Sequence, residues 1–208
     1  QGENAVAVGL CKQLSRGEGD KQAFLWGDGG VGKTHLLQAV CGEAAKQGLL
    51  VSYIPLGDVL EYGPLVLEGL EGRNLVCIDD IQCCAGRREW EEAVFGFVNQ
   101  CRITQAQLLF SANNPPSQLG VELPDLQSRL GWGAVVQVQE LSEEGKLAWL
   151  GQRAQAQGLN MPEEVARYLL RHHPRDMHSQ NKLLSQLNTA SLAAQRRLTV
   201  AFVKEALT

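Results

Sequence analysis

The sequence predicts an α/β fold, with a five-stranded parallel sheet flanked by helices and then a small α-helical lid. Short apolar runs alternate with segments of helical length over the first 140 residues. That alternation is typical of parallel strands covered by helices on both faces. A glycine-rich segment directly follows the first apolar run, and no run of strand length appears after residue 141. We therefore expect a core over residues 1–140 and a lid over residues 141–208.

Two strands and one helix are expected in the first 54 residues. Ala23–Trp26 is an apolar run that ends at a glycine, as a buried strand before a tight turn would. His35–Lys46 is predicted to be a helix because Gly48 follows it, the residue that most often closes a helix. Leu49–Ile54 is the next strand, and the proline after it stops the pairing.

The remaining core elements follow the same alternation. Leu75–Ile78 is wholly apolar and predicts a buried strand. Glu89–Ile103 carries its apolar residues at helical spacing. Leu108–Ser111 and Ala134–Val138 complete the five strands, and a short helix is expected from Leu123 to Arg129.

The lid is predicted from capping signals. Ser142 precedes two glutamates, which favours a helix that begins there and runs to about residues 153–157. Further helices are expected from residue 162 to 172, from 174 to about 192, and from 199 onward.

Composition narrows the function classes. The chain has 208 residues, of which 44% are hydrophobic and 20% charged, so collagen-like, disordered and disulfide-scaffold proteins are excluded. No apolar run approaches the roughly 18–20 residues of a membrane span. The six cysteines form no C-x-x-C pair and indicate reduced thiols. We expect a cytoplasmic protein that does not associate with membranes.

The charge is distributed unevenly along the chain. Residues 1–164 carry 12 basic and 21 acidic side chains, whereas residues 165–208 carry 7 and 2. The net charge of −4 disfavours strong direct binding to duplex DNA, which requires basic surfaces. The basic C-terminal part is either a solvated helix face or a surface for an acidic partner or for phosphates.

One segment matches a phosphate-binding motif in full. Residues 27–34 read GDGGVGKT, which fits G-x-x-x-x-G-K-[ST] between a predicted strand and a predicted helix. The glycines let backbone N–H groups surround a phosphate at a helix N-terminus. We expect Lys33 to reach the β- and γ-phosphates and Thr34 to coordinate Mg²⁺. The expected phosphate contacts are Asp28, Gly29, Gly30, Val31, Gly32, Lys33, Thr34 and His35.

Two acids after the buried strand would complete this site. Asp79 and Asp80 directly follow residues 75–78, so their side chains should emerge beside the phosphates. We expect Asp79 to hold Mg²⁺ through water and Asp80 to orient an attacking water.

Three single residues have two interpretations each when taken alone. Asn113 follows the strand expected beside Asp79 and is either a ligand of the γ-phosphate or lytic water or simply a turn residue. Arg129 is either functional or a surface arginine. Arg175 lies in a first helical turn, where a cation is disfavoured. It either faces a phosphate or is offset by Asp176.

These motifs resemble a known family. The segments GKTHLLQA (32–39), IDDIQ (78–82) and SRLGWG (128–133) look like the AAA+ domain of the bacterial replication initiator DnaA. Residues 2–4 and 202–207 are similar to the two ends of that domain, and Asp80 in place of a glutamate is typical of the initiator branch.

Two departures favour one branch of this family. Only the 20 residues 55–74 separate the second strand from the acidic strand, where initiators carry a helical insertion. The chain also ends at Thr208, where initiators continue into a duplex-binding domain. Both features, and the run at 193–199, resemble the Hda-type regulatory inactivators of DnaA.

The resemblance implies a specific function. Such proteins bind ADP with Mg²⁺ and, together with the DNA-loaded sliding clamp, stimulate hydrolysis of the ATP bound to DnaA. Arg129 matches the arginine finger that acts in trans, Asn113 matches sensor 1 and Arg175 matches sensor 2. The resemblance further implies a homodimer or higher oligomer, weak or absent ATPase activity of its own, and clamp binding through a segment N-terminal to this chain.

An alternative function is open at this stage. Lys33, Asp79, Asp80 and Asn113 are all present, which permits a self-sufficient, DNA-stimulated AAA+ ATPase such as a helicase loader. A small-molecule kinase is disfavoured because the lid offers only Arg175 as a phosphate-binding arginine. Neither the base nor the resting diphosphate or triphosphate state follows from the sequence.

Overall fold

The computed structural model describes residues 2–174 and 176–207, without the side chain of His178. Its contacts divide the chain into two compact units. Apart from the first two residues, one unit extends from Glu3 to Gln139 and the other from Glu140 onward. Each unit has its own hydrophobic core.

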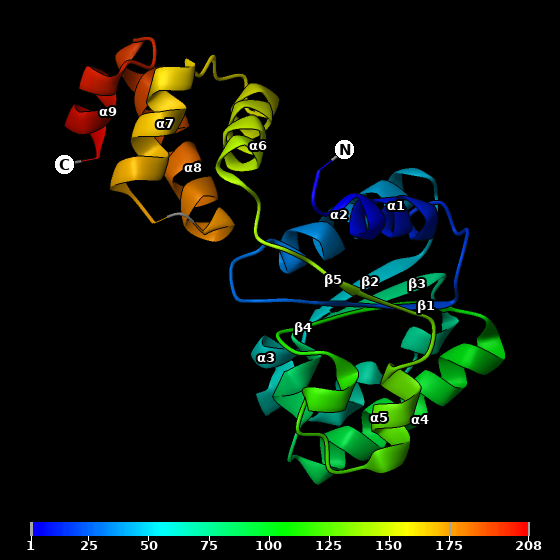
Figure 1. Cartoon of the computed structure of the whole chain (residues 1–208). Coiled ribbons are helices and arrows are strands. Elements are labelled where there is room, and N and C mark those ends of the chain that lie inside the picture. The colour runs from blue at the N-terminus through cyan, green and yellow to red at the C-terminus, as the bar shows by residue number, and fades with distance from the viewer. Residues whose placement is uncertain (1, 175, 208) are drawn as a thin grey trace. The chain divides into compact units, whose positions relative to one another are not determined.

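The first unit contains a sheet of five strands in the order β2-β3-β4-β1-β5, with parallel pairing throughout (Figure 1). The predicted α/β fold is therefore confirmed. The strands are β1 Gln22–Trp26, β2 Val51–Pro55, β3 Leu75–Asp79, β4 Gln107–Ala112 and β5 Ala134–Gln137. Because all strands run the same way, their carboxyl ends lie at one edge of the sheet and their amino ends at the other.

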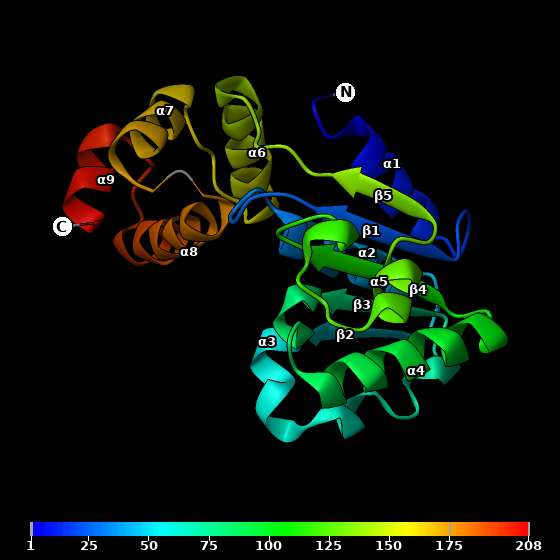
Figure 2. The same ribbon diagram turned by 60° about the horizontal axis from the view of Figure 1, so that its bottom comes forward.

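Helices cover both faces of this sheet (Figures 1 and 2). Alternate strand residues point to opposite faces, so Ala23 and Leu25 pack in one core cluster and Phe24 in the other. The first face is covered by α1 Ala5–Leu14 and α2 Lys33–Lys46, and the second by α3 Leu56–Val59, α4 Arg88–Thr104 and α5 Pro124–Leu130. Short 3₁₀ turns at Leu60–Tyr62, Pro64–Leu67 and Leu70–Gly72 lead from α3 to β3, and another spans Ile81–Cys84.

The second unit is the helical lid. Its helices α6 Glu143–Ala156, α7 Glu163–His172, α8 Met177–Ala194 and α9 Val200–Ala206 enclose an apolar core. Three of them begin at side-chain caps: Ser142, Asp176 and Thr199 accept hydrogen bonds from N–H groups in the following turn. Within the described residues, no helix is long and apolar enough to cross a membrane. All six cysteines are free thiols.

A buried carboxylate fixes the start of α5. Glu91 of α4 is 2% exposed. Its Oε1 accepts hydrogen bonds from the N–H groups of Gly86 (2.8 Å) and Glu122 (3.0 Å), and its Oε2 accepts one from Leu123 (2.8 Å). Because Leu123 immediately precedes α5, this single side chain ties α4 to the loop that leads into α5. The α5 helix carries Arg129, so Glu91 also helps to position that residue.

Replacing Glu91 should therefore destabilise the core. In Glu91→Gln an amide NH₂ stands where an acceptor was, which leaves buried backbone N–H groups without a partner. We expect the free energy of unfolding to fall by about 2 kcal/mol, measured by urea denaturation. Glu92→Gln is the matched control, since the neighbouring Glu92 is exposed and pairs with Arg88 on the surface. Equal stability of the two variants would contradict this role of Glu91.

Candidate functional site

The glycine-rich loop joins the end of β1 to the start of α2. At Gly27 a side chain is excluded, because an added Cβ would lie 2.3 Å from the carbonyl oxygen of Val138. Gly32 caps the N-terminus of α2 with φ 104°, a conformation that favours glycine. The loop thus reaches α2 along a path that only glycines allow at these positions. It ends at a helix N-terminus, where an anion is stabilised.

Lys33 is the cation of this loop. The side chain is only 5% exposed. Its Nζ donates hydrogen bonds to the carbonyl oxygens of Gly27 (2.8 Å) and Asp28 (2.9 Å) and to Oδ1 of Asn113 (3.1 Å). Burial lowers the pKa of the ammonium, and the carboxylates of Asp80, Asp79 and Asp28 oppose that shift. Neutral acceptors thus hold the ammonium at the loop. An anionic phosphate would be a stronger partner for it than any of them.

Asp79 is held by hydroxyl groups from both neighbouring strands. The side chain is 3% exposed. The Tyr53 hydroxyl of β2 donates to its Oδ2 (2.7 Å), and the Ser111 hydroxyl of β4 donates to its Oδ1. Burial and then this hydrogen bond raise the pKa of Tyr53 well above its usual value. The phenol therefore remains a donor at neutral pH, and the carboxylate is fixed in orientation.

Asp80 turns away from the strand. Its backbone adopts a left-handed conformation with φ 55°, a region that aspartate tolerates better than most residues. Its N–H donates to the Ser111 hydroxyl (3.0 Å), and its Oδ1 accepts from Nε2 of Gln82 (3.0 Å). Ser111 therefore contacts both acids, and it gives them a fixed relative position.

The donor set fits a Mg²⁺ ion that is only partly coordinated by protein. Thr34 is exposed in the first turn of α2, and both oxygens of Asp79 already accept hydrogen bonds. Among the described residues, no three His, Cys, Asp or Glu side chains form a metal-binding group. A Mg²⁺ ion here would take Thr34 as a ligand, contact Asp79 through water, and complete its shell with phosphate oxygens.

Arg129 lies at the other edge of the sheet. Gln22, the first residue of β1, donates from Nε2 to the carbonyl oxygens of Arg129 (2.7 Å) and Trp132 (3.0 Å). Gly27 follows the last residue of the same strand. Five strand residues span about 16 Å, so Arg129 is held far from the phosphate loop. Its guanidinium carbon lies 3.9 Å from the centre of the Trp132 ring and 5.8 Å from that of Phe95.

The structure thus brings part of the predicted set together. Lys33, Asn113 and the three acids lie around the loop, and Thr34 and His35 form the first turn of α2. Arg129 is not part of this cluster, and Arg175 lies outside the described residues. Sequence reasoning missed Tyr53 and Ser111. Their signal was weak, namely hydroxyl residues near the carboxyl ends of the strands that flank Asp79.

Comparison with known families gives two matches. Residues 68–137 match the family model of the bacterial DnaA ATPase domain, and residues 143–207 match that of the Hda lid domain. The two matches lie in the core and in the lid, respectively.

Solved structures support the fold. Domain III of the Thermotoga maritima replication initiation protein DnaA superposes with a TM-score of 0.79 at 20% identity, covering 98% of this chain and 90% of that one. AMPPCP-bound DnaA from Aquifex aeolicus superposes with a TM-score of 0.74 at 24% identity, covering 92% of this chain. The Thermotoga maritima RuvB branch migration motor superposes with a TM-score of 0.64 at 17% identity, covering 97% of this chain. This chain covers 63% of the Aquifex protein and 66% of RuvB.

Removal of the Lys33 ammonium should weaken nucleotide binding. We expect Lys33→Ala to bind a fluorescent ADP analogue roughly 10- to 100-fold more weakly, because a charge-assisted hydrogen bond to phosphate is lost. Lys46→Ala is the matched control, since Lys46 is exposed at the other end of the same helix. Fluorescence anisotropy measures both, and a thermal melt confirms folding. Unchanged affinity of Lys33→Ala would rule out the loop as the phosphate site.

The hydroxyl of Tyr53 should affect how strongly Mg²⁺ stimulates ADP binding. Tyr53→Phe removes one of the two hydroxyl donors that orient Asp79. The Mg²⁺ concentration for half-maximal stimulation of ADP binding should rise about tenfold, while Mg²⁺-free binding stays the same. Tyr62→Phe is the control because Tyr62 is 69% exposed. A Mg²⁺ titration of ADP affinity decides, and identical curves for the two variants would contradict this role of Tyr53.

Proposed function

Because this chain is a DnaA-related AAA+ protein with an Hda-type lid, we propose that it is a nucleotide-bound regulator of replication initiation that stimulates hydrolysis of ATP held by DnaA. One observation carries the proposal: Arg129 is fixed at the sheet edge opposite the chain's own phosphate loop. An arginine so placed serves a nucleotide bound by another molecule.

The chain's own nucleotide has a regulatory role in this proposal. ADP and Mg²⁺ would be held by the loop: Lys33 would contact the β-phosphate, Thr34 would be a ligand of the ion, and Arg175 would be the sensor 2 residue. Two DnaA structures similar to this chain contain AMPPCP, which supports an adenine nucleotide here. In this proposal the ATPase activity of the chain itself is weak or absent. The sliding clamp on DNA binds a segment N-terminal to this chain, and the protein forms a homodimer or higher oligomer.

The proposed reaction takes place on the partner's ATP. A water oxygen attacks the γ-phosphorus, the bond from that phosphorus to the β–γ bridging oxygen breaks, and ADP and inorganic phosphate are formed. Arg129 donates hydrogen bonds to the phosphate oxygens on which negative charge develops. A finger of this kind contributes roughly 10³- to 10⁵-fold in rate. Arg129 is half-buried and its guanidinium lies against Trp132 and Phe95, so the cation is presented in a limited range of positions.

A second candidate function rests on the cluster around Lys33. Asp79, Asp80 and Asn113 lie around this lysine as an ATP-hydrolysing site requires. With these groups in place, the protein would be a self-sufficient, DNA-stimulated AAA+ ATPase such as a helicase loader.

The finger assignment predicts a loss of stimulation without a loss of binding. DnaA-bound radiolabelled ATP is incubated with clamp-loaded DNA and the protein carrying its N-terminal segment. Arg129→Ala should reduce the stimulated hydrolysis at least about 100-fold. Arg129→Lys should recover little, because an ammonium lacks the planar fork. Arg73→Ala, at an exposed arginine before β3, is the control.

The same assay distinguishes the two functions. Full stimulation by Arg129→Ala would contradict the finger assignment. Steady-state ATP turnover by this protein alone, accelerated by DNA and without any effect on DnaA-bound ATP, would favour the helicase-loader type of ATPase instead.

A further inference from the structure

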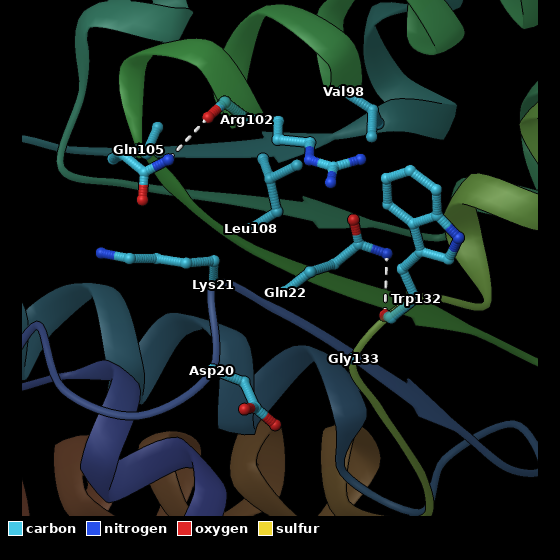
Figure 3. A pocket seen from close by; sticks show the side chains of 10 residues that line it. Asp20, Lys21, Gln22, Val98, Arg102, Gln105, Leu108, Trp132 and Gly133 are labelled. Carbon is cyan, nitrogen blue, oxygen red and sulfur yellow. Dashed lines mark hydrogen bonds between the residues drawn. The ribbon is translucent and has the colours of Figure 1, made fainter.

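A pocket lies at the amino-terminal edge of the sheet, and Figure 3 shows the residues that line it. We call it the edge pocket. Its volume is about 280 Å³, and it lies between the start of β1, the end of α4 and the turn before β5. Ligand pockets typically measure about 300–1,000 Å³, so this one suits a side chain or two rather than a cofactor. Its lining residues are Asp20, Lys21, Gln22, Val98, Arg102, Gln105, Ala106, Leu108, Trp132 and Gly133.

The edge pocket is cationic although the body of the protein is acidic. Lys21 and Arg102 line it, and Figure 3 shows the carboxylate of Asp20 turned away from both. Within residues 2–174 and 176–207, neither cation forms a salt bridge. Two cations without an acidic partner, beside the apolar walls of Val98 and Leu108, favour a carboxylate that brings a short apolar stem.

The pocket is pre-organised. The guanidinium of Arg102 lies over the Trp132 ring, with its carbon 4.4 Å from the ring centre. This stacking leaves the N–H groups at the edge of the guanidinium able to donate to a carboxylate. Buried Gln107 donates from Nε2 to the carbonyl oxygens of Glu18 (2.8 Å) and Asp20 (3.2 Å), which fixes the loop before Lys21. Less entropy is therefore lost when a partner binds.

The edge pocket also adjoins the arginine finger. Trp132 contacts the guanidinium of Arg129 as well as that of Arg102. Gln22 lines the pocket and holds the backbone of residues 129, 130 and 132. A group bound in the pocket therefore lies against the segment that presents Arg129.

We propose that the edge pocket receives a carboxylate side chain from an acidic segment of the initiator, and that this contact docks the edge of the sheet that carries Arg129. The inference rests on the proposed function and adds the chemistry of the contact. DNA phosphate is the less favoured occupant, because a duplex requires an extended basic surface and residues 1–164 carry 12 basic against 21 acidic side chains.

The test is equilibrium binding of purified, ADP-loaded protein to DnaA by biolayer interferometry, at several salt concentrations. Lys21→Glu and Arg102→Gln should each weaken binding roughly tenfold and flatten its salt dependence. Lys12→Glu is the matched charge reversal, at an exposed position on α1 outside the pocket. Lys21→Glu is decisive, because it leaves the stack of Arg102 on Trp132 untouched. Circular dichroism melts confirm that each variant folds.

Each alternative outcome has its own meaning. Wild-type affinity of Lys21→Glu, with stimulation still lost in Arg129→Ala, would overturn the edge-pocket proposal and leave the proposed function standing. Loss of stimulation in Arg102→Gln with unchanged binding of both variants would assign the pocket to positioning Arg129 and overturn docking. If Lys21→Glu and Arg102→Gln lose affinity for a 20-base-pair duplex but not for DnaA, phosphate is the occupant and the proposal is overturned. No binding of DnaA by the wild-type protein would overturn both.

Discussion

The buried carboxylate of Asp79 constrains the whole phosphate site. An ionised acid in an apolar sheet costs several kcal/mol unless hydrogen bonds compensate it. The compensation comes from Tyr53 of β2 and Ser111 of β4, so it exists only if β3 lies between these two strands. Ser111 then accepts the N–H of Asp80, and Asn113, two residues further on, accepts from Lys33. Two sets of hydrogen bonds, one around Ser111 and one at Asn113, thereby tie both acids and the loop lysine to the end of β4.

A parallel sheet has two chemically different edges, and in this protein each edge carries its own group of polar residues. The carboxyl edge bears the loop, the acids and the helix N-terminus that favour anions. The amino edge bears Arg129, the stacked Arg102 and the edge pocket. Gln22 joins the second edge to the first, since its side chain holds the backbone at Arg129 and its strand leads directly into Gly27. A cation fixed at one edge and a phosphate loop at the other form an arrangement suited to action between molecules.

Local features of this protein could be predicted from sequence, whereas contacts between strands could not. The alternation of apolar runs predicted the α/β fold. The contiguous motif at residues 27–34, between a predicted strand and a predicted helix, indicated the phosphate loop. Tyr53 and Ser111 escaped notice because their role depends on strand order and register, which periodicity does not reveal. The helical spacing over residues 89–103 gives no sign that Glu91 is buried and fixes the start of α5. The pairing of Arg102 with Trp132 likewise joins elements 30 residues apart.

The surroundings of Arg129 suit a cation that must remain available. A carboxylate would hold a guanidinium firmly, but it would also occupy the N–H groups and neutralise the charge that the proposed finger would offer to a phosphate. Aromatic faces attract the cation through their quadrupole and leave those N–H groups at its edge. In the part of the chain that the structure describes, Arg129 contacts Trp132 and Phe95 and forms no salt bridge. Its backbone, by contrast, is held by Gln22 and, through the start of α5, by Glu91. The main chain is therefore fixed while the charge stays unpaired, which is the combination that a finger acting on another molecule's phosphates requires.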